Sequence, residues 1–343
     1  MSSASGSSTV EPTASGGTAR FGLGTVQTVR GPIRAADLGE TLMHEHVFVR
    51  DHEVEVNYPG LSEEDTRHDA AVRKLRDAAA RGVRSVVDLT VLGLGRDVAA
   101  VRRVAEQVDV NIVVATGLYT YDDVPFAFRF FGDGPPAQRR DLLTSLFVRD
   151  LTDGIGETGV RAAVLKCATD SPGVTPGVER VLRAVARAHR ETGAPISTHT
   201  DAVTRRGLDQ QAVFRREGVD LERVVIGHCG DSDDLDYLQR LMDAGSVIGM
   251  DRFGLDRRLH FDRRVDTVAA LCARGYADRM VLSHDAPCFT CNFEIRRDPE
   301  ALPRWRLTHL HDEVIPALRD RGVTATQVTQ MLVDNPIRVL AAP

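Results

Sequence analysis

Lysine is nearly absent from this sequence. Of the 43 basic side chains in 343 residues, only Lys74 and Lys166 are lysines. Arginine stays protonated at physiological pH, whereas a buried lysine can lose its proton and react as a neutral amine. Each retained lysine therefore raises the question of whether an amine is needed at its position. We interpret Lys74 as a residue on the solvated face of a predicted helix, with no function of its own.

Long apolar runs are also absent, and no stretch approaches the roughly 18 apolar residues that cross a bilayer. Residues 1–20 lack the basic and apolar regions of a signal peptide, and their Ser, Gly, Ala and Thr content predicts a disordered N-terminal tail. The net charge of -6 argues against nucleic acid or an anionic membrane as a partner. Five cysteines are too few for a secreted disulfide framework, so a cytoplasmic location is expected.

Two of the cysteines, Cys288 and Cys291, form a C-x-x-C motif in the segment Pro287 to Pro303. This spacing occurs in redox motifs and in halves of zinc sites. The sequence has no second C-x-x-C and no thioredoxin-like strand, motif and helix around this one. We interpret the pair as two loop cysteines and keep a redox role as an alternative.

Short apolar segments alternate with amphipathic ones along the chain. The predicted strands are 41–49, 85–90, 111–117, 162–168, 195–200, 223–228, 246–252 and 280–286, and the predicted helices are 63–81, 96–108, 137–153, 177–192, 204–217, 232–244, 263–274 and 307–320. Eight such units predict an α/β fold of the (β/α)8 TIM barrel type. We expect residues 21–343 to form a single domain, with an extra helix at 324–341 packed across the outside.

Histidines gather where a barrel builds its active site. Five of the eleven lie in predicted strands or at their C-terminal ends: His44, His46, His199, His228 and His284. Side chains two apart on a strand share a face, so the first two imidazoles point the same way and suit a metal ion. Asp285 follows the eighth strand and adds a carboxylate. Strand alternation predicts that its neighbour His284 faces away and is structural.

The second lysine, Lys166, ends the predicted fourth strand and would lie in the same ring as the histidines. An ammonium there would be repelled by a metal ion. A neutral amine can instead react with carbon dioxide to give a carbamate, whose oxygens can bridge two metals. Two divalent cations with a carbamate, Asp285 and a hydroxide would leave a net charge of about +1, which suits a developing oxyanion.

These residues together resemble the phosphotriesterase family of the amidohydrolase superfamily, from about Val26 to Pro343. The motifs that carry the resemblance are TLMHEH (41–46), Lys166, His199 in STHTDA, His228 in IGHCGDSDD and Asp285 in SHDAP. The resemblance implies two divalent metal ions, one held by His44, His46 and Asp285 and the other by His199 and His228, with N6-carboxylated Lys166 and a hydroxide bridging them. Zinc is expected, with cobalt, manganese or iron as alternatives.

Two positions resemble the phosphotriesterase-like lactonases within this family. Tyr119 stands where the specialised organophosphate hydrolases have a tryptophan, and Arg252 stands where they have a histidine followed by a long insertion. The resemblance implies a quorum-quenching lactonase that opens N-acyl homoserine lactones by attack of the metal-bridging hydroxide and hydrolyses organophosphates slowly. It also implies a homodimer. Tyr119 would contact the hydroxide or the substrate, Arg252 would steady the eighth loop, and Asp285 would move the proton.

Other functions stay open on the sequence. The main substrate could be an organophosphate or another ester, the chain could be a non-catalytic metal-binding protein, or the two loop cysteines could act in redox chemistry. Asp231 either relays a proton, as in the organophosphate hydrolases, or pairs with Arg252.

Overall fold

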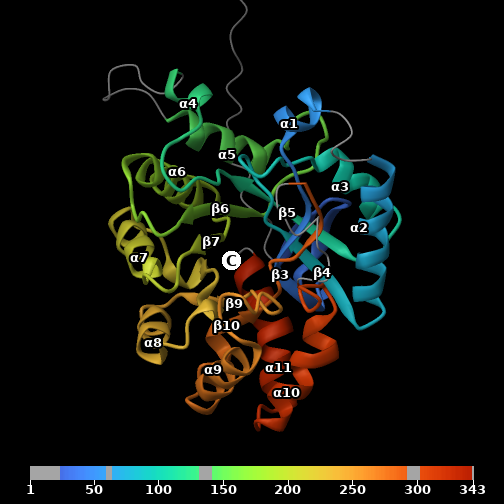
Figure 1. Cartoon of the computed structure of the whole chain (residues 1–343). Coiled ribbons are helices and arrows are strands. Elements are labelled where there is room, and N and C mark those ends of the chain that lie inside the picture. Colours follow the sequence, from blue (N-terminus) through green and yellow to red (C-terminus); the bar gives the residue numbers. More distant parts are fainter. Residues whose placement is uncertain (1–23, 59–63, 131–140, 292–301, 342–343) are drawn as a thin grey trace, which may run out of the picture.

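Nine parallel strands form one sheet in the computed structural model, which describes residues 24–58, 64–130, 141–291 and 302–341. The sheet order is β10-β9-β8-β7-β6-β5-β4-β3-β11. Figure 1 shows the helices as a ring around these strands, so the predicted (β/α)8 barrel is confirmed. The predicted tail, residues 1–20, lies outside the described residues, and the domain limits of 21 and 343 stay predictions.

All eight predicted strands are present. They are β3 (Glu40–Val49), β4 (Val83–Asp88), β5 (Asn111–Gly117), β6 (Val164–Thr169), β7 (Ile196–Thr200), β8 (Val224–Ile226), β9 (Val247–Met250) and β10 (Met280–Leu282). The additional strand β11 (Pro287–Thr290) pairs with β3. An antiparallel hairpin of β1 (Thr25–Thr28) and β2 (Gly31–Arg34), which the sequence did not predict, precedes the barrel.

The helices that cover the strands also agree with the prediction. They are α2 (Glu64–Ala79), α3 (Val98–Ala105), α5 (Leu142–Thr152), α6 (Pro176–Thr192), α7 (Arg206–Arg216), α8 (Leu235–Asp243) and α9 (Phe261–Ala273), followed by a π-helical turn at Leu310–Val314 that runs into α10 (Ile315–Asp320). Helix α6 shows why its bounds are readable: the Thr175 hydroxyl accepts a hydrogen bond from Val178 N, and Gly193 ends the helix at φ 76°. Two short helices, α1 (His52–Asn57) and α4 (Phe126–Phe130), were not predicted.

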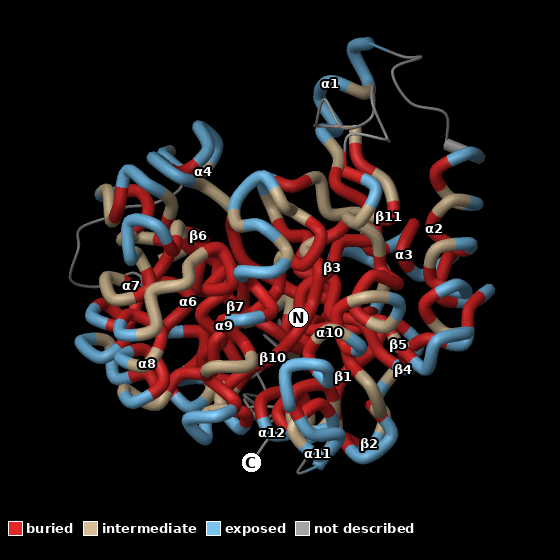
Figure 2. The backbone as a smooth tube through the Cα atoms, turned by 60° about the horizontal axis from the view of Figure 1, so that its bottom comes forward, coloured by how far each residue is buried: buried red, intermediate tan, exposed pale blue. Residues whose placement is uncertain are grey.

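Two apolar clusters make up the core. The larger one fills the space between the strands and the surrounding helices. The smaller one contains mostly valines and alanines from the strands and includes Val113, Val225 and Val281. Small β-branched residues fit the narrow interior of an eight-stranded barrel. Figure 2 shows these buried segments inside the ring and the exposed residues along the outer helices.

A bulge in β3 changes which side chains reach the interior. Met43 belongs to the inner cluster, and the adjacent His44 lines the pocket above it. Regular alternation would put one of these neighbours outside. The pairing of β3 with β4 shifts register between Leu42 and Glu45, which is the sign of a β-bulge. The bulge therefore lets consecutive residues serve the core and the pocket.

The barrel closes where β10 meets β3, and Glu45 holds this seam. Its buried carboxylate accepts hydrogen bonds from the Ser283 hydroxyl (2.8 Å), the backbone N–H groups of His284 (3.0 Å) and Ala286 (2.9 Å), and His284 Nδ1 (2.6 Å). These bonds replace sheet pairing, so β10 ends at Leu282 rather than at residue 286 as predicted. The chain turns through Asp285 at φ 54° before it resumes as β11.

His284 is structural as predicted, for a different reason. Its side chain is fully buried, and its Nε2 accepts a hydrogen bond from Leu310 N at 3.0 Å. Strand alternation does not explain this, because residues 283–286 lie outside the regular strands. The left-handed backbone of Asp285 separates the two side chains instead.

The C-terminal segment covers the N-terminal ends of the strands. The predicted helix 324–341 is divided into α11 (Ala325–Thr329), a π-helical turn (Gln330–Asp334) and α12 (Asn335–Leu340). Asn335 Nδ2 donates to the carbonyls of Ala277 (2.8 Å) and Met280 (2.7 Å), where β10 begins. Val339 and Leu340 join the inner cluster, so the segment closes the bottom of the barrel rather than crossing its outside.

Two smaller predictions need correction. Lys74 is half-buried rather than solvated, and its Nζ donates to the carbonyl of Pro287 at 3.3 Å. Cys288 lies in strand β11 rather than in a loop, and both Cys288 and Cys291 are free thiols. Burial raises the pKa of Cys288 to about 12, which is opposite to the low pKa of a redox-active thiol.

Among the described residues, no helix is both long and apolar enough to cross a membrane.

We expect Glu45→Ala to lower the free energy of unfolding by about 3 kcal/mol, because it leaves several buried donors of the seam without an acceptor. The measurement is a urea or guanidinium unfolding curve. Glu106→Ala, at an exposed glutamate on the end of α3, is the matched control and should change stability by less than about 0.5 kcal/mol. Equal stability of the two variants would contradict the role given to Glu45.

Candidate metal centre

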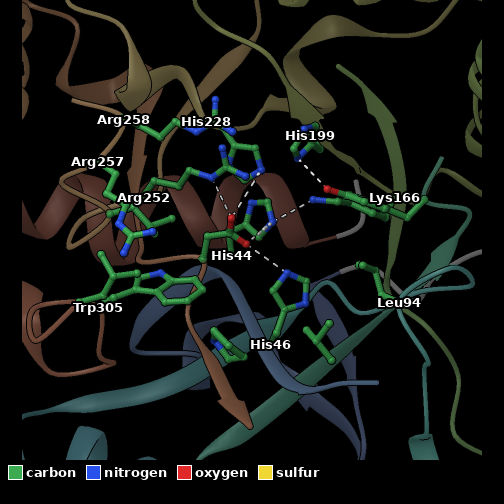
Figure 3. Close-up of a pocket in the computed structure, with 16 residues that line it drawn as sticks. His44, His46, Leu94, Lys166, His199, His228, Arg252, Arg257, Arg258 and Trp305 are labelled. Atoms are coloured by element: carbon green, nitrogen blue, oxygen red, sulfur yellow. Dashed lines mark hydrogen bonds and ion pairs between the residues drawn. The ribbon is translucent and has the colours of Figure 1, made fainter. Parts of the chain in front are cut away.

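A pocket of about 230 Å³ opens at the C-terminal ends of the strands. It is lined by all six predicted metal ligands and both further predicted site residues: His44, His46, Lys166, His199, His228, Asp285, Tyr119 and Arg252. Apolar side chains complete the wall, namely Val49, Leu94, Leu255, Pro287, Leu302 and Trp305. Figure 3 shows the imidazoles and Lys166 pointing toward a common centre. The structure therefore brings together every residue that the sequence selected for this site.

Several elements supply these side chains. His44 and His46 come from β3, Lys166 from β6 and His199 from β7, whereas the other four follow the ends of their strands. His228 and Asp285 have left-handed backbones, with φ of 60° and 54°. Such conformations cost about 1–3 kcal/mol for residues other than glycine and concentrate at functional sites. Hydrogen bonds from His228 N to Asp251 Oδ1 (2.7 Å) and from Asp285 N to His44 O (2.9 Å) hold them in place.

Asp285 lies at the middle of the group. Its Oδ1 is 3.1 Å from His46 Nε2 and 3.5 Å from His44 Nε2, and its Oδ2 is 3.7 Å from His228 Nε2. Burial alone would raise the pKa of this carboxyl group, but its contacts with His44, Arg252 and His46 outweigh burial and hold the pKa well below its usual value. Asp285 is therefore a carboxylate.

The imidazoles of His44 and His228 share one outer partner. The Asp251 carboxylate accepts from His44 Nδ1 through Oδ2 (2.8 Å) and from His228 Nδ1 through Oδ1 (3.0 Å). Both Nε2 atoms are thereby left as acceptors that face the pocket. Asp251 does not line the pocket itself. Burial lowers the pKa of both histidines well below the usual value, so both are neutral, which is the form that binds metals.

The other two histidines have outer partners of their own. His46 Nδ1 lies 2.8 Å from Thr90 Oγ1, which in turn donates to Asp88. His199 uses the opposite nitrogen: its Nε2 lies 2.8 Å from Asp170 Oδ2, and its Nδ1 faces the pocket. Burial lowers the pKa of His199 to about 4, and the hydrogen bond to His199 lowers that of Asp170. Each of the four ring systems is therefore oriented by a second partner.

Tyr119 reaches the centre beside His199. Its hydroxyl lies 3.3 Å from His199 Nδ1 and is hydrogen-bonded to the Tyr121 hydroxyl. Burial and the neighbouring Tyr121 raise the pKa of Tyr119 well above its usual value. The phenol is therefore protonated and can donate a hydrogen bond into the pocket.

Lys166 is fully buried, with its Nζ 2.9 Å from His44 Nε2. Burial lowers its pKa to about 8, so the neutral amine is far more accessible than in water. The neighbouring strand approaches closely here, because a Cβ at Gly117 would lie 1.9 Å from the carbonyl oxygen of Lys166. Only glycine fits at this point of β5, because any side chain would clash with the backbone of Lys166 on the neighbouring strand.

Arg252 closes one side of the site through a buried ionic chain. Its Nε donates to Asp285 Oδ2 (2.8 Å) and its Nη1 to Asp231 Oδ2 (2.9 Å). The other oxygen of Asp231 accepts from the buried Arg264 at 2.8 Å. Of the two roles considered for Asp231, pairing with Arg252 is the one that the structure shows. The arginine holds Asp285 directly.

The sequence reasoning missed the outer partners Asp251, Asp170, Thr90 and Asp88. A signal was available, because an acidic residue ends β4 and others follow β6 and β9. Histidine ligands nearly always need a second acceptor to fix their tautomer. Acidic residues at strand ends next to histidine-bearing strands could therefore have been selected.

The donor set fits divalent cations. One ligand atom each from His44, His46 and Asp285 lies within 4.8 Å of the others, and all three face the pocket. A second group, His44, His228 and Asp251, meets the same distance criterion. There the histidine atoms are already engaged by the Asp251 carboxylate, so the first group is the candidate metal site. Neutral imidazoles, a carboxylate and a buried amine together suit zinc and similar ions.

A closed parallel barrel with a convergent histidine and carboxylate centre at its C-terminal end defines the chain as a metal-dependent hydrolase of the TIM-barrel class. The model of the phosphotriesterase family matches residues 24–340, and the chain belongs to this family. Members of the family are hydrolases with a binuclear metal centre.

Named relatives agree with this assignment. A "Phosphotriesterase homology protein" of Mycobacterium tuberculosis is 57% identical over 315 residues, which cover 92% of this chain and 97% of that protein. An "Aryldialkylphosphatase" of Saccharolobus solfataricus is 38% identical over 307 residues, covering 89% of this chain and 95% of the relative. The solved structure of the phosphotriesterase from Mycobacterium tuberculosis matches with a TM-score of 0.89 at 56% identity and covers 93% of this chain and 98% of that one.

We expect Asp251→Asn to weaken metal binding by about 10- to 100-fold, because an amide can accept from only one side and presents an NH₂ group to the other imidazole. The measurement is metal content by mass spectrometry after equilibration with chelators of graded affinity. Asp109→Asn, at an exposed aspartate outside the pocket, is the control. Wild-type metal retention in Asp251→Asn would show that Asp251 does not orient the ligands.

Proposed function

We propose that this chain is a lactonase that opens N-acyl homoserine lactones and related lactones, and that it hydrolyses phosphotriesters more slowly. The observation that carries the proposal is the position of Tyr119. A protonated phenol beside His199, at the edge of the metal centre, can donate a hydrogen bond to the oxygen of a lactone carbonyl. That bond strengthens as the carbonyl oxygen gains negative charge, so it favours the tetrahedral transition state.

The residues assigned to metal binding follow the resemblance and the geometry. His44, His46 and Asp285 would hold one ion, and His199 and His228 the other, with Lys166 between them. When bound, divalent cations would lower the pKa of a coordinated water toward about 7 and polarise the substrate oxygen. The metals are proposed to be zinc, with cobalt, manganese or iron as alternatives.

Lys166 is proposed to be carboxylated. The neutral amine attacks carbon dioxide, an Nζ–C bond forms, and one proton is released to give a carbamate. This change converts a buried cation beside four histidines into an anion, which suits a site that takes up positive charge. The support lies in the burial of Lys166 and in its contact of 2.9 Å with His44.

Asp285 is proposed to move the proton. It accepts the proton of the attacking water and returns it to the alkoxide that leaves when the lactone ring opens. The hydrogen bond from Arg252 holds the carboxylate in position during this exchange. Arg252 thus acts on the reaction through Asp285.

A second candidate is an enzyme whose main substrate is a phosphotriester. The observation that favours it is the 38% identity to a relative named aryldialkylphosphatase. The same hydrogen-bond donors and the same proton acceptor would serve a trigonal-bipyramidal phosphorus centre. The two candidates therefore differ in substrate fit rather than in chemistry.

One comparison separates these candidates: kcat/KM for a set of N-acyl homoserine lactones of increasing chain length against kcat/KM for paraoxon. We expect the lactones to be favoured, and Tyr119→Phe to lower lactone turnover several-fold because the hydrogen-bond donor is lost. A clear preference for paraoxon would replace the lactonase assignment with the second candidate. Metal-loaded protein inert toward both classes would contradict both.

We expect Lys166→Ala to lose binuclear metal binding and activity, and a short carboxylic acid to restore part of the activity by supplying the missing carboxylate. Metal content and lactone turnover are measured together. Lys74→Ala removes the other lysine and should keep the metals, because Lys74 lies outside the pocket. Carbon-13 NMR after exposure to labelled carbon dioxide should show a carbamate signal in wild type only. Unchanged metal content in Lys166→Ala would refute the carbamate.

A further inference from the structure

Two arginines at the pocket have no charge partner among the described residues. Arg257 and Arg258 lie in the loop between β9 and α9, and both are exposed and line the pocket. Neither guanidinium makes a hydrogen bond or ion pair within the described ranges. By contrast, Arg252 at the base of the same loop is paired with Asp231 and Asp285. The mouth of the pocket therefore carries two positive charges that no described residue neutralises.

The loop that carries these arginines is firmly held. Arg258 N donates to Leu255 O at 3.1 Å, and the buried Arg264 donates to the same carbonyl at 3.1 Å. Gly254 has φ 97°, and a Cβ there would lie 2.4 Å from the carbonyl oxygen of Arg304, so the loop packs tightly on the segment beside it. A rigid backbone lowers the entropy lost when the side chains bind a ligand.

The acidic side chain that precedes these arginines in the sequence has another partner. Asp256, directly before the two arginines, pairs with Arg304 at 3.3 Å. Arg304 also pairs with Glu313 at 3.0 Å. Among the described residues of this loop, Asp256 therefore pairs with Arg304 rather than with Arg257 or Arg258.

The pocket borders another cavity on the side of Arg257. A second cavity of about 480 Å³ shares Arg257 and Leu302 with the first. Figure 3 places Arg257 and Arg258 on the same side of the centre as Trp305, opposite Lys166 and Leu94. A substrate arm that leaves the centre on this side would lie beside Leu302, Trp305 and the guanidinium groups.

We propose that Arg257 and Arg258 bind a carboxylate at the end of the substrate's arm, so that the preferred substrates are lactones or esters with an anionic arm. The inference rests on the proposed function and specifies its substrate class. Guanidinium groups stay charged at all physiological pH values and match the two oxygens of a carboxylate. Leu255, Leu302 and Trp305 provide the apolar wall for the methylene groups in between. The carboxylate itself is unchanged by the reaction.

The test uses substrates that differ only in charge. Homoserine lactone is acylated with adipic acid, which leaves a terminal carboxylate, or with its monoamide, which leaves a neutral amide. The same pair is prepared as 4-nitrophenyl esters. For the wild-type holoenzyme at low salt we expect kcat/KM to favour the carboxylate about tenfold, which corresponds to one charge-assisted hydrogen bond. The preference should shrink at about 0.5 M salt, because the mouth is open to solvent.

Variants assign the preference to the two residues. Arg257→Gln with Arg258→Gln should bring the carboxylate-to-amide ratio close to one, and the double change to glutamate should bring it below one. The double change to lysine should keep part of the preference, because the charge stays and the planar fork is lost. Arg240→Gln is the matched control, since this exposed arginine on α8 does not line the pocket. Circular dichroism and metal content verify that the variants are folded and loaded.

The outcomes separate this inference from the proposed function. A wild-type ratio of one or less, or a ratio that survives the double change to glutamine, overturns the inference. If only the nitrophenyl esters react and they show the ratio, the lactonase proposal fails and the inference stands. If lactones are opened without any charge preference, the lactonase proposal stands and the inference fails. For protein that turns over neither pair, calorimetry with the corresponding non-hydrolysable lactams measures the affinities for the carboxylate form and the amide form. The ratio of these affinities then replaces the ratio of kcat/KM values.

Discussion

The Glu45 carboxylate is the constraint on which the active end of this barrel depends. It sits on the strand that carries His44 and His46 and binds the backbone of the segment that carries Asp285. The first and last strands of the barrel are thereby fixed to one another at the height of the metal centre. Because these bonds replace sheet pairing, they also create the turn that puts Asp285 in a left-handed conformation. The same hydrogen bonds therefore close the barrel and position the Asp285 carboxylate.

A second layer of hydrogen bonds converts histidines into oriented ligands. Asp251 serves two rings through its two oxygens, while Asp170 and Thr90 serve one ring each. The ring nitrogen that faces the pocket is not the same in all four histidines. It is Nδ1 in His199 and Nε2 in the other three. An apolar barrel interior alone would leave the imidazoles free to rotate. The outer partners define which lone pair faces the centre, and so they decide the shape of the site.

Much of the fold and of the site could be predicted from the sequence. The strands are buried on both faces, so their β-branched runs stand out, and the spacing of His44 and His46 is visible without a structure. Features that depend on contacts between distant residues could not be predicted. The turn at Asp285 requires Glu45, which lies 240 residues earlier in the chain. Only the structure shows that Asp256 pairs with Arg304 and that no described residue pairs with Arg257 or Arg258. Lys74 was misjudged for the same reason, since its acceptor belongs to β11.

The C-terminal segment that covers the N-terminal ends of the strands affects when the barrel can close during synthesis on the ribosome. The inner cluster contains Val26, near the first described residue, and Leu340, near the last. A nascent chain cannot complete this interior until α12 has emerged from the ribosome. Before that point the apolar ends of the strands are exposed to the chaperones that attend the growing chain.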